Sequence, residues 1–161
     1  MKIEFLNPFI SSTIKNLEAM AQIQAKRGKM AIDKEGKSNV LSDGILLIIG
    51  ITGDLIGRII YNMSLETSLN IVSAMMFEEV TEFNADCKDA LCELANIISG
   101  NSSTLLNNAG YKVDITTPTI IKAKEIDLDD FQQDKIINLI VNLDSDKGTV
   151  ILNLALKEKN S

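Results

Sequence analysis

Asp89, Glu93 and Asn96 are spaced so that a single helix would carry all three side chains on one face. Glu93 and Asn96 lie three residues apart, a spacing at which helical side chains are neighbours. A carboxylate there can pair with a cation on a partner, and a carboxamide can donate to and accept from a water molecule. The pair could hold a water in position for attack, as a glutamine does in phosphoryl hydrolysis. The alternative for so common a pattern is a solvated polar face.

The segment that must position these residues runs from Asp86 to Asn107 without a proline, and its apolar residues recur at helical spacing. At about 100° per residue, one side would carry Cys87, Leu91, Leu94, Ala95 and Ile98, and the other Asp89, Glu93, Asn96, Gly100, Ser103 and Asn107. We predict a helix that buries the first side, exposes the second and stops at Gly110. A glycine in mid-helix costs roughly 1 kcal/mol relative to alanine, so Gly100 either leaves room for the close approach of another molecule or is a chance glycine on a solvated face.

Composition excludes several classes of protein. The chain has 161 residues, of which 45% are hydrophobic, and this suits a single domain covering residues 1–161. The net charge is −6 and there is no basic patch, which disfavours nucleic acids and anionic membranes as partners. No apolar run is long enough to span a bilayer, and the first residues lack the pattern of a signal peptide, so a cytoplasmic protein is expected.

Histidine is absent, which removes Ser-His-Asp and Cys-His catalysis and most zinc sites. Catalysis would depend on carboxylates, amides, hydroxyls or lysines, or on a substrate that is itself reactive. Cys87 and Cys92 lie five residues apart in the predicted helix, where they point in different directions and cannot form a disulfide. They are interpreted as buried or half-buried thiols.

The remaining elements are predicted from periodicity and turn residues. Asn7-Pro8 is expected to open a helix that runs to about Ala21, with Asn7 as its cap, and Ser64 to cap another. Gly53-Asp54 and the segment Asp144–Gly148 are each expected to turn a hairpin. The predicted strands are Gln24–Ile32, Ile45–Thr52, Leu55–Met63, Tyr111–Thr116 with an extended continuation at Ile120–Ala123, Asp134–Leu143 and Thr149–Leu156, with an acidic loop at Asp127–Gln132. The order helix, three strands, two helices, three strands predicts an α/β (α+β) sandwich with a largely antiparallel sheet.

Two short motifs are interpreted as turns. Thr52-Gly53-Asp54 lacks the Gly-Lys-Ser/Thr of a phosphate-binding loop and is not followed by a predicted helix. Asp144-x-Asp146 resembles the start of a calcium loop, but its glycine falls one position early and no closing glutamate follows.

The pattern Asp89-x-x-x-Glu93-x-x-Asn96, followed by Pro118 after a gap of 21 residues, is similar to the signature of the CheC/CheX/FliY family of chemotaxis phosphatases. Other stretches resemble the family in the same order, namely the hairpin Gly50–Gly57, Ser64 and the helix after it, Ile98-x-Gly100-Asn101 and Thr116-Thr117-Pro118-Thr119. The resemblance covers roughly residues 5 to 156. It is strongest to the CheX branch, because Glu18 in the first predicted helix has no asparagine three residues on, and so only one copy of the signature is present.

The resemblance implies a function in two-component signalling. It implies a phosphatase that removes the aspartyl phosphate of a CheY-type response regulator, with Asn96 orienting the attacking water and Glu93 pairing with the receiver's lysine. Asp89 and Gly100 would contact the partner. It further implies a homodimer with no cofactor or metal of its own, the Mg²⁺ being held by the receiver.

Two other functions remain open at this point. A non-catalytic adaptor of the same fold could bind receivers or flagellar-switch components without accelerating the loss of phosphate. A small-molecule binding domain is the third alternative, and only the expected α/β core supports it.

Overall fold

The computed structural model describes residues 3–33, 43–123 and 138–159. A short 3-10 helix, η1 (Ile3–Phe5), comes first, and the α-helices are α1 (Asn7–Ala21), α2 (Leu65–Met76) and α3 (Ala85–Asn108). The strands are β1 (Lys26–Asp33), β2 (Ile45–Gly53), β3 (Leu55–Met63), β4 (Val113–Ile115), β5 (Thr119–Lys122), β6 (Asn138–Ser145) and β7 (Gly148–Glu158). The predicted acidic loop at 127–132 and residues 134–137 of the predicted strand lie outside the described residues.

The strands form one antiparallel sheet in the order β1-β6-β7-β3-β2, with β4 and β5 both paired to the outer edge of β2. Two predicted hairpins build its centre. Gly53, with φ +108°, turns β2 into β3, and Gly148, with φ +123°, opens β7 after β6. These left-handed conformations are ones that glycine adopts without steric cost, which explains why the turns fall there. The predicted mixed fold with an antiparallel sheet is confirmed.

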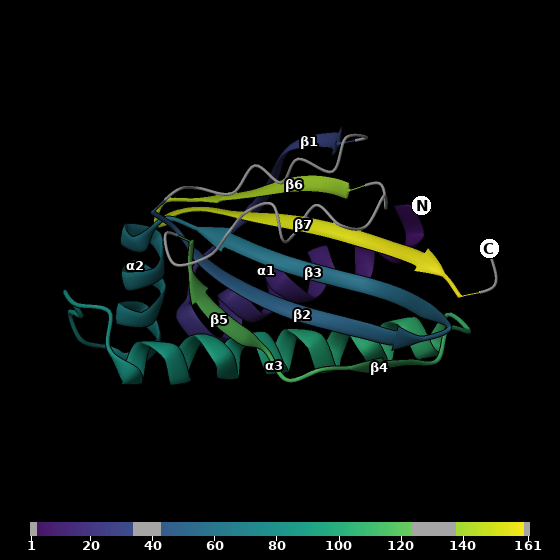
Figure 1. Ribbon diagram of the computed structural model, residues 1–161. Helices are drawn as coiled ribbons and strands as arrows, with labels where there is room; N and C mark the ends of the chain where they lie inside the picture. The colour runs from purple at the N-terminus through teal and green to yellow at the C-terminus, as the bar shows by residue number, and fades with distance from the viewer. Residues whose placement is uncertain (1–2, 34–42, 124–137, 160–161) are drawn as a thin grey trace.

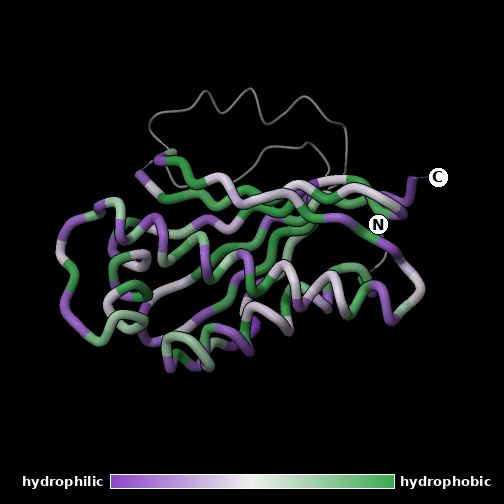
Figure 2. Tube along the Cα trace, turned by 90° about the horizontal axis from the view of Figure 1, so that it is seen from below, coloured by the Kyte–Doolittle hydropathy of each residue, from purple (hydrophilic) through white to green (hydrophobic). Residues whose placement is uncertain are grey.

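The helices pack on one face of this sheet. Figure 1 shows α1 and α3 behind and below the strands and α2 at one end of the sheet, and Figure 2 shows the helices on one side of the strands. Alternate strand residues such as Ile49, Ile59 and Leu154 point into the main core with Leu91 and Ile98 of α3. A smaller apolar cluster of Leu46, Ile48, Ile60 and Ala123 lies on the opposite face. None of the helices in the described part of the chain is long and apolar enough to span a membrane.

Local signals explain most helix ends. The Ser64 hydroxyl accepts from Thr67 N (3.0 Å) and caps α2 as predicted. The prediction that Asn7 caps α1 was wrong, because the capping position is Leu6, which has no side-chain hydrogen bond to the helix. The reason is that η1 leads directly into α1, and the carbonyl of Leu6 already accepts from Phe9 N and Ile10 N. Asn7 is therefore the first residue inside the helix.

The extended segment after α3 is divided into two short strands. β4 and β5 both pair with β2, and the chain between them contains Pro118, which has no N–H for a ladder bond. Thr116 spans the interruption, since its N–H donates to Gly50 O (3.0 Å) and its hydroxyl accepts from Gly50 N (2.8 Å). This edge of the sheet is the side against which α3 packs.

Candidate functional site

Helix α3 carries the residues that the sequence singled out. Its start is defined by Asn84, whose side-chain oxygen accepts from Cys87 N (3.1 Å). Its buried side includes all five predicted residues, Cys87, Leu91, Leu94, Ala95 and Ile98, and continues through Ser99, Ser102 and Leu106. Asp89, Glu93, Asn96 and Gly100 are all exposed on the other side, and we refer to these four residues as the α3 ledge.

The polar side chains of the ledge are available for contacts with another molecule. Among the residues that the structure describes, the side chains of Asp89, Glu93 and Asn96 have no hydrogen-bond or ion-pair partner. A carboxylate and a carboxamide one helical turn apart are thus directed to the surroundings of the molecule. The carboxylate can accept from a cationic donor, while the carboxamide can both donate and accept.

Gly100 is not required by packing within the chain. A Cβ atom added there would meet no described atom within 4 Å outside its own helix, and its φ lies outside the left-handed region. An alanine would therefore fit the free chain and favour the helix. The open space above Gly100 adjoins Asn96, one turn earlier, so the ledge has a flat stretch beside its carboxamide.

Ile97 adds an apolar surface that sequence reasoning missed. Its side chain is 37% exposed, although it follows Asn96 in a helix whose other large apolar residues up to that point are mostly buried. Its position four residues after Glu93 places the two side chains on neighbouring parts of the helix surface. The helical spacing could have predicted this exposure, because at about 100° per residue Ile97 falls outside the side of the helix that carries the buried residues.

The cysteines contribute no nucleophile at the ledge. Cys87 is buried, Cys92 is half-buried, and both are free thiols as predicted. Burial raises the pKa of the Cys92 thiol, and the carboxylate of Asp89, three residues before it, raises the pKa further. The thiol of Cys92 is therefore protonated at neutral pH, and the thiolate is the reactive form.

The far end of the predicted polar side is tied to the sheet. The Ser103 hydroxyl donates to Val113 O (3.5 Å), and the Asn107 side-chain oxygen accepts from Val113 N (3.3 Å). These residues therefore hold β4 against α3 and leave the ledge as the available part of that side. The residue Pro118, which belongs to the sequence signature, is buried between β4 and β5.

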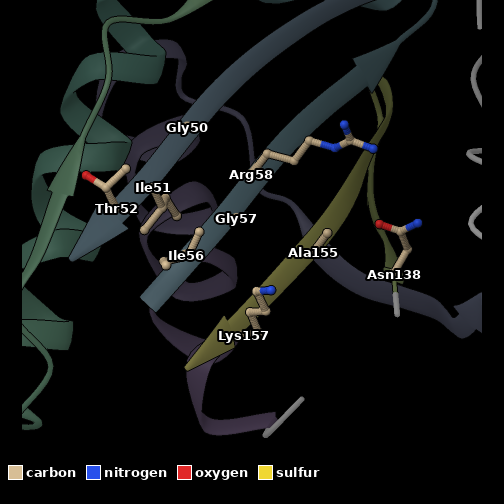
Figure 3. A pocket seen from close by; sticks show the side chains of 9 residues that line it. All are labelled: Gly50, Ile51, Thr52, Ile56, Gly57, Arg58, Asn138, Ala155 and Lys157. Atoms are coloured by element: carbon tan, nitrogen blue, oxygen red, sulfur yellow. The ribbon is translucent and has the colours of Figure 1, made fainter. Parts of the chain in front are cut away.

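A cavity of about 360 Å³ lies elsewhere, on the sheet face opposite the helices. Figure 3 shows Arg58 of β3 and Lys157 of β7 beside it, with Asn138 at the start of β6. Their neighbours Ile59 and Leu156 point to the core on the other face, so this cavity does not join the α3 ledge. Sequence reasoning did not find it, because its basic residues come from strands far apart in the chain.

No cluster of three or more His, Cys, Asp or Glu side chains in the described residues could hold a metal ion. The ledge itself has two carboxylates and one carboxamide, all on one exposed helix surface. This arrangement suits contact with a partner molecule.

The chain is similar to chemotaxis proteins in sequence. A family model described as chemotaxis phosphatase CheX matches residues 45–142, more than half of the chain. CheY-P phosphatase CheX of Thermotoga maritima is 30% identical over 132 residues, which cover 81% of this chain and 83% of the relative.

Solved structures of chemotaxis proteins have a similar fold. A CheC-like superfamily protein from Shewanella sp. PV-4 matches with a TM-score of 0.84 and 25% identity over 98% of this chain and 99% of that one. The CheX–CheY–BeF3–Mg²⁺ complex from Borrelia burgdorferi matches with a TM-score of 0.79 and 27% identity over 98% of this chain and 100% of that one.

The fold, an antiparallel sheet with helices packed on one face, is therefore that of a CheC-like protein. Within this class the chain belongs to the CheX family of chemotaxis phosphatases, as the family model and the Thermotoga maritima relative show. The family resemblance inferred from the sequence is confirmed.

Proposed function

We propose that this chain accelerates hydrolysis of the aspartyl phosphate on a CheY-type response regulator and so ends a chemotaxis signal. The single observation that carries the proposal is the α3 ledge, with Glu93 and Asn96 exposed one turn apart in a chain of the CheX family. The Thermotoga maritima relative is itself a CheY-P phosphatase, which supports the same substrate class here.

In this mechanism Asn96 orients the attacking water. Its carboxamide accepts a hydrogen bond from the water and holds the oxygen in line with the phosphorus. The water oxygen bonds to phosphorus while the bond from phosphorus to the aspartate oxygen breaks, and inorganic phosphate and a free carboxylate result. An acyl phosphate has a good leaving group, so positioning supplies the rate and no histidine base is needed.

The other ledge residues hold the receiver. Glu93 pairs with the receiver's lysine near the phosphate, and this charge-assisted contact fixes the register of α3 in the receiver's site. Gly100 allows close approach beyond Asn96, and Asp89 supports the contact from the turn before Glu93. The Mg²⁺ belongs to the receiver, in keeping with the Borrelia burgdorferi complex, which contains CheY and Mg²⁺ together.

The protein is proposed to act in the cytoplasm as a homodimer with one site per chain. One site is expected because Glu18 on α1 is followed at the third position by Ala21. Light scattering of the purified protein should give about twice the mass of the chain, which is 17.6 kDa. A mass equal to one chain at micromolar concentration would contradict the dimer.

The deciding experiment measures loss of phosphate from a Mg²⁺-bound, phosphorylated CheY-type receiver with wild type, Asn96→Ala and Asn108→Ala. Both asparagines are exposed on α3, but Asn108 lies about 120° around the helix from Asn96. Wild type and Asn108→Ala should accelerate the loss, and Asn96→Ala should not. Full activity of Asn96→Ala would overturn the mechanism. Binding without acceleration by wild type would favour the non-catalytic adaptor.

A further inference from the structure

An exposed aromatic residue stands at the end of α2. Phe77 follows the last residue of the helix and is 80% exposed, the largest value among the large apolar residues of the described chain. Met76 beside it is also exposed, at 37%. Scattered exposed apolar residues are ordinary, but an exposed methionine followed by an exposed phenylalanine at a projecting turn offers apolar surface to a partner.

The backbone of Phe77 is unfavourable for its side chain. It has φ +54° and ψ +34°, the left-handed conformation, and its N–H donates to Ser73 O to close the helix. Glycine or asparagine usually occupies this position, because a bulky residue there is sterically strained. Since Phe77 is exposed, packing within the chain does not compensate for the strain. Strained residues of this kind are concentrated at functional sites.

The turn that carries Phe77 is held in place. The Ser73 hydroxyl accepts from Val80 N (2.9 Å) and contacts Val80 O (3.4 Å), and Glu78 N donates to Ser73 O (3.2 Å). Val80 packs against the main core. Phe77 is thus presented on a short bridge between two anchored residues, so little conformational entropy is lost when a partner binds it. We refer to residues 76–79 as the α2–α3 tip.

The part of the chain that follows this tip is acidic. Between Phe77 and Asn96 it has six carboxylates and one lysine, a net charge of −5. The carboxylates are Glu78, Glu79, Glu82, Asp86, Asp89 and Glu93, and all of them are exposed. A complementary partner would have an apolar hollow surrounded by lysines or arginines.

The tip and the α3 ledge lie within reach of one partner. The loop between α2 and α3 projects from the end of the molecule where α3 begins, as both views show (Figures 1 and 2). From Ala85 to Glu93 the helix rises about 12 Å. An ordinary interface covers about 800 Å² on each partner and is therefore about 30 Å across. Exposed Asp86 and Asp89 connect the tip to Glu93 along the helix.

We infer that the α2–α3 tip is a second docking element for the same phosphorylated receiver, with Phe77 as its apolar anchor and the adjoining carboxylates facing a basic surface. This inference rests on the proposed phosphatase function. The tip determines which receiver is bound and how tightly, whereas Asn96 determines the rate of hydrolysis. The tip contacts a part of the receiver outside the phosphate site, which is contacted by the ledge.

The test variant is Phe77→Gly, which removes the anchor and also relieves the strain. The KM for the phosphorylated receiver should rise about tenfold, in the range of an aromatic interface anchor, while kcat stays unchanged. The melting temperature should not fall, because glycine suits the left-handed backbone. Phe77→Tyr should keep the low KM. The matched control is Ile32→Ser, which changes an exposed residue (63%) on β1 at the opposite edge of the sheet and should leave the KM unchanged.

A binding measurement separates failure of this inference from failure of the proposed function. The dissociation constant is measured for a CheY-type receiver loaded with Mg²⁺ and BeF3, a state that needs no turnover. Weaker binding by Phe77→Gly, and weaker binding by wild type at higher salt, support the docking role even if catalysis is absent. Unchanged binding and KM in Phe77→Gly would overturn the inference and leave the phosphatase intact. Binding that changes only together with the oligomeric state would assign the tip to self-association instead and overturn the inference too.

Discussion

At the residue scale, the α3 ledge combines a charged acceptor with a neutral side chain that both donates and accepts. Glu93 and Asn96 differ in what they can do, since only the carboxylate attracts a cation and only the carboxamide can orient a water through either of its ends. Neither has a partner among the described residues, so neither must break an internal contact before a receiver binds. Their substitution should therefore affect activity much more than stability.

Gly100→Ala should affect stability and activity in opposite directions. The free chain has space for the methyl group, and alanine favours the helix by about 1 kcal/mol, so the melting temperature should rise by about 2–4 °C. If the receiver approaches closely there, the methyl group overpacks the contact at about 1–3 kcal/mol, and kcat/KM should fall at least about fivefold. Thermal unfolding and phosphate-release assays check the two effects. Unchanged kcat/KM would show that the partner does not approach Gly100.

Glu93→Gln should weaken the enzyme through the loss of one charge. The amide is nearly the same shape as the carboxylate but cannot pair with a lysine, and a hydrogen bond to a charged group contributes about 1.5–3 kcal/mol. A fall in kcat/KM of about 10- to 100-fold is therefore expected. Glu18→Gln, on the exposed surface of α1, is the matched control and should have wild-type activity. An equal effect of both variants would indicate that only overall charge matters.

At the scale of elements, each part of the sheet has a separate task. The edge formed by β2, β4 and β5 supports α3, and Ser103 and Asn107 fasten the helix to Val113 of β4. The central strands β3 and β7 supply much of the core, but their outer face contains polar residues. Asn153 of β7 is only 3% exposed, and both polar atoms of its amide have no hydrogen-bond partner in the described structure.

Asn153→Leu should stabilise the protein. The residue is paired across the sheet with Ile60 on one side and Ile140 on the other, so leucine would enter apolar surroundings. A buried polar group without a partner costs about 1–3 kcal/mol, and leucine has a similar shape, so the unfolding free energy should rise by about 1–2 kcal/mol. Denaturant titration measures the change. The half-buried Asn142 on β6 is a control, since Asn142→Leu should change stability by less than about 0.5 kcal/mol. A lower midpoint for Asn153→Leu would contradict the prediction.

At the scale of the whole molecule, charge and core are separated. An acidic stretch with a net charge of −5 lies between Phe77 and Asn96, at one end of the helical layer, and the core is formed mainly by aliphatic residues from the sheet and helices. Tyr61 is an exception inside this core, since it is fully buried with its hydroxyl 3.3 Å from Thr13 Oγ1. Burial raises the pKa of Tyr61 from 10.0 to about 12, against the opposing effect of the hydrogen bond to Thr13.

Stability should consequently fall at alkaline pH. Because the folded pKa of Tyr61 lies above the unfolded value, its contribution is fully present below pH 10 and is lost as the pH rises to about 12. A difference of about two pKa units corresponds to about 2–3 kcal/mol. The unfolding free energy of wild type should therefore decrease by about that amount more than that of Tyr61→Phe between pH 9 and 12. Denaturant titrations of both proteins across this range measure it, and parallel curves would show that Tyr61 does not titrate this way.

Local chemistry in the sequence determined the helices, the hairpins and the identity of the ledge. The limits of α1 and α2, the Ser64 cap and the turns at Gly53 and Gly148 follow from spacing and backbone preference within a few residues. The exposed side of α3 follows equally, because helical periodicity places Asp89, Glu93, Asn96 and Gly100 together wherever the helix packs. These features depend on interactions between residues close in the chain.

The tertiary structure decided what periodicity cannot specify. Strands of similar aliphatic composition do not reveal their partners, so only the fold shows that β1 pairs with β6 and that β4 and β5 share β2. It also decided that η1 displaces Asn7 from the capping position and that Ser103 and Asn107 bind β4. The residue type of Phe77 does not reveal that it is exposed, since phenylalanine is common in helices and cores, and only the packing of α2 leaves it at the surface. Each of these outcomes depends on contacts between distant segments, whose free energy is a property of the whole packed molecule.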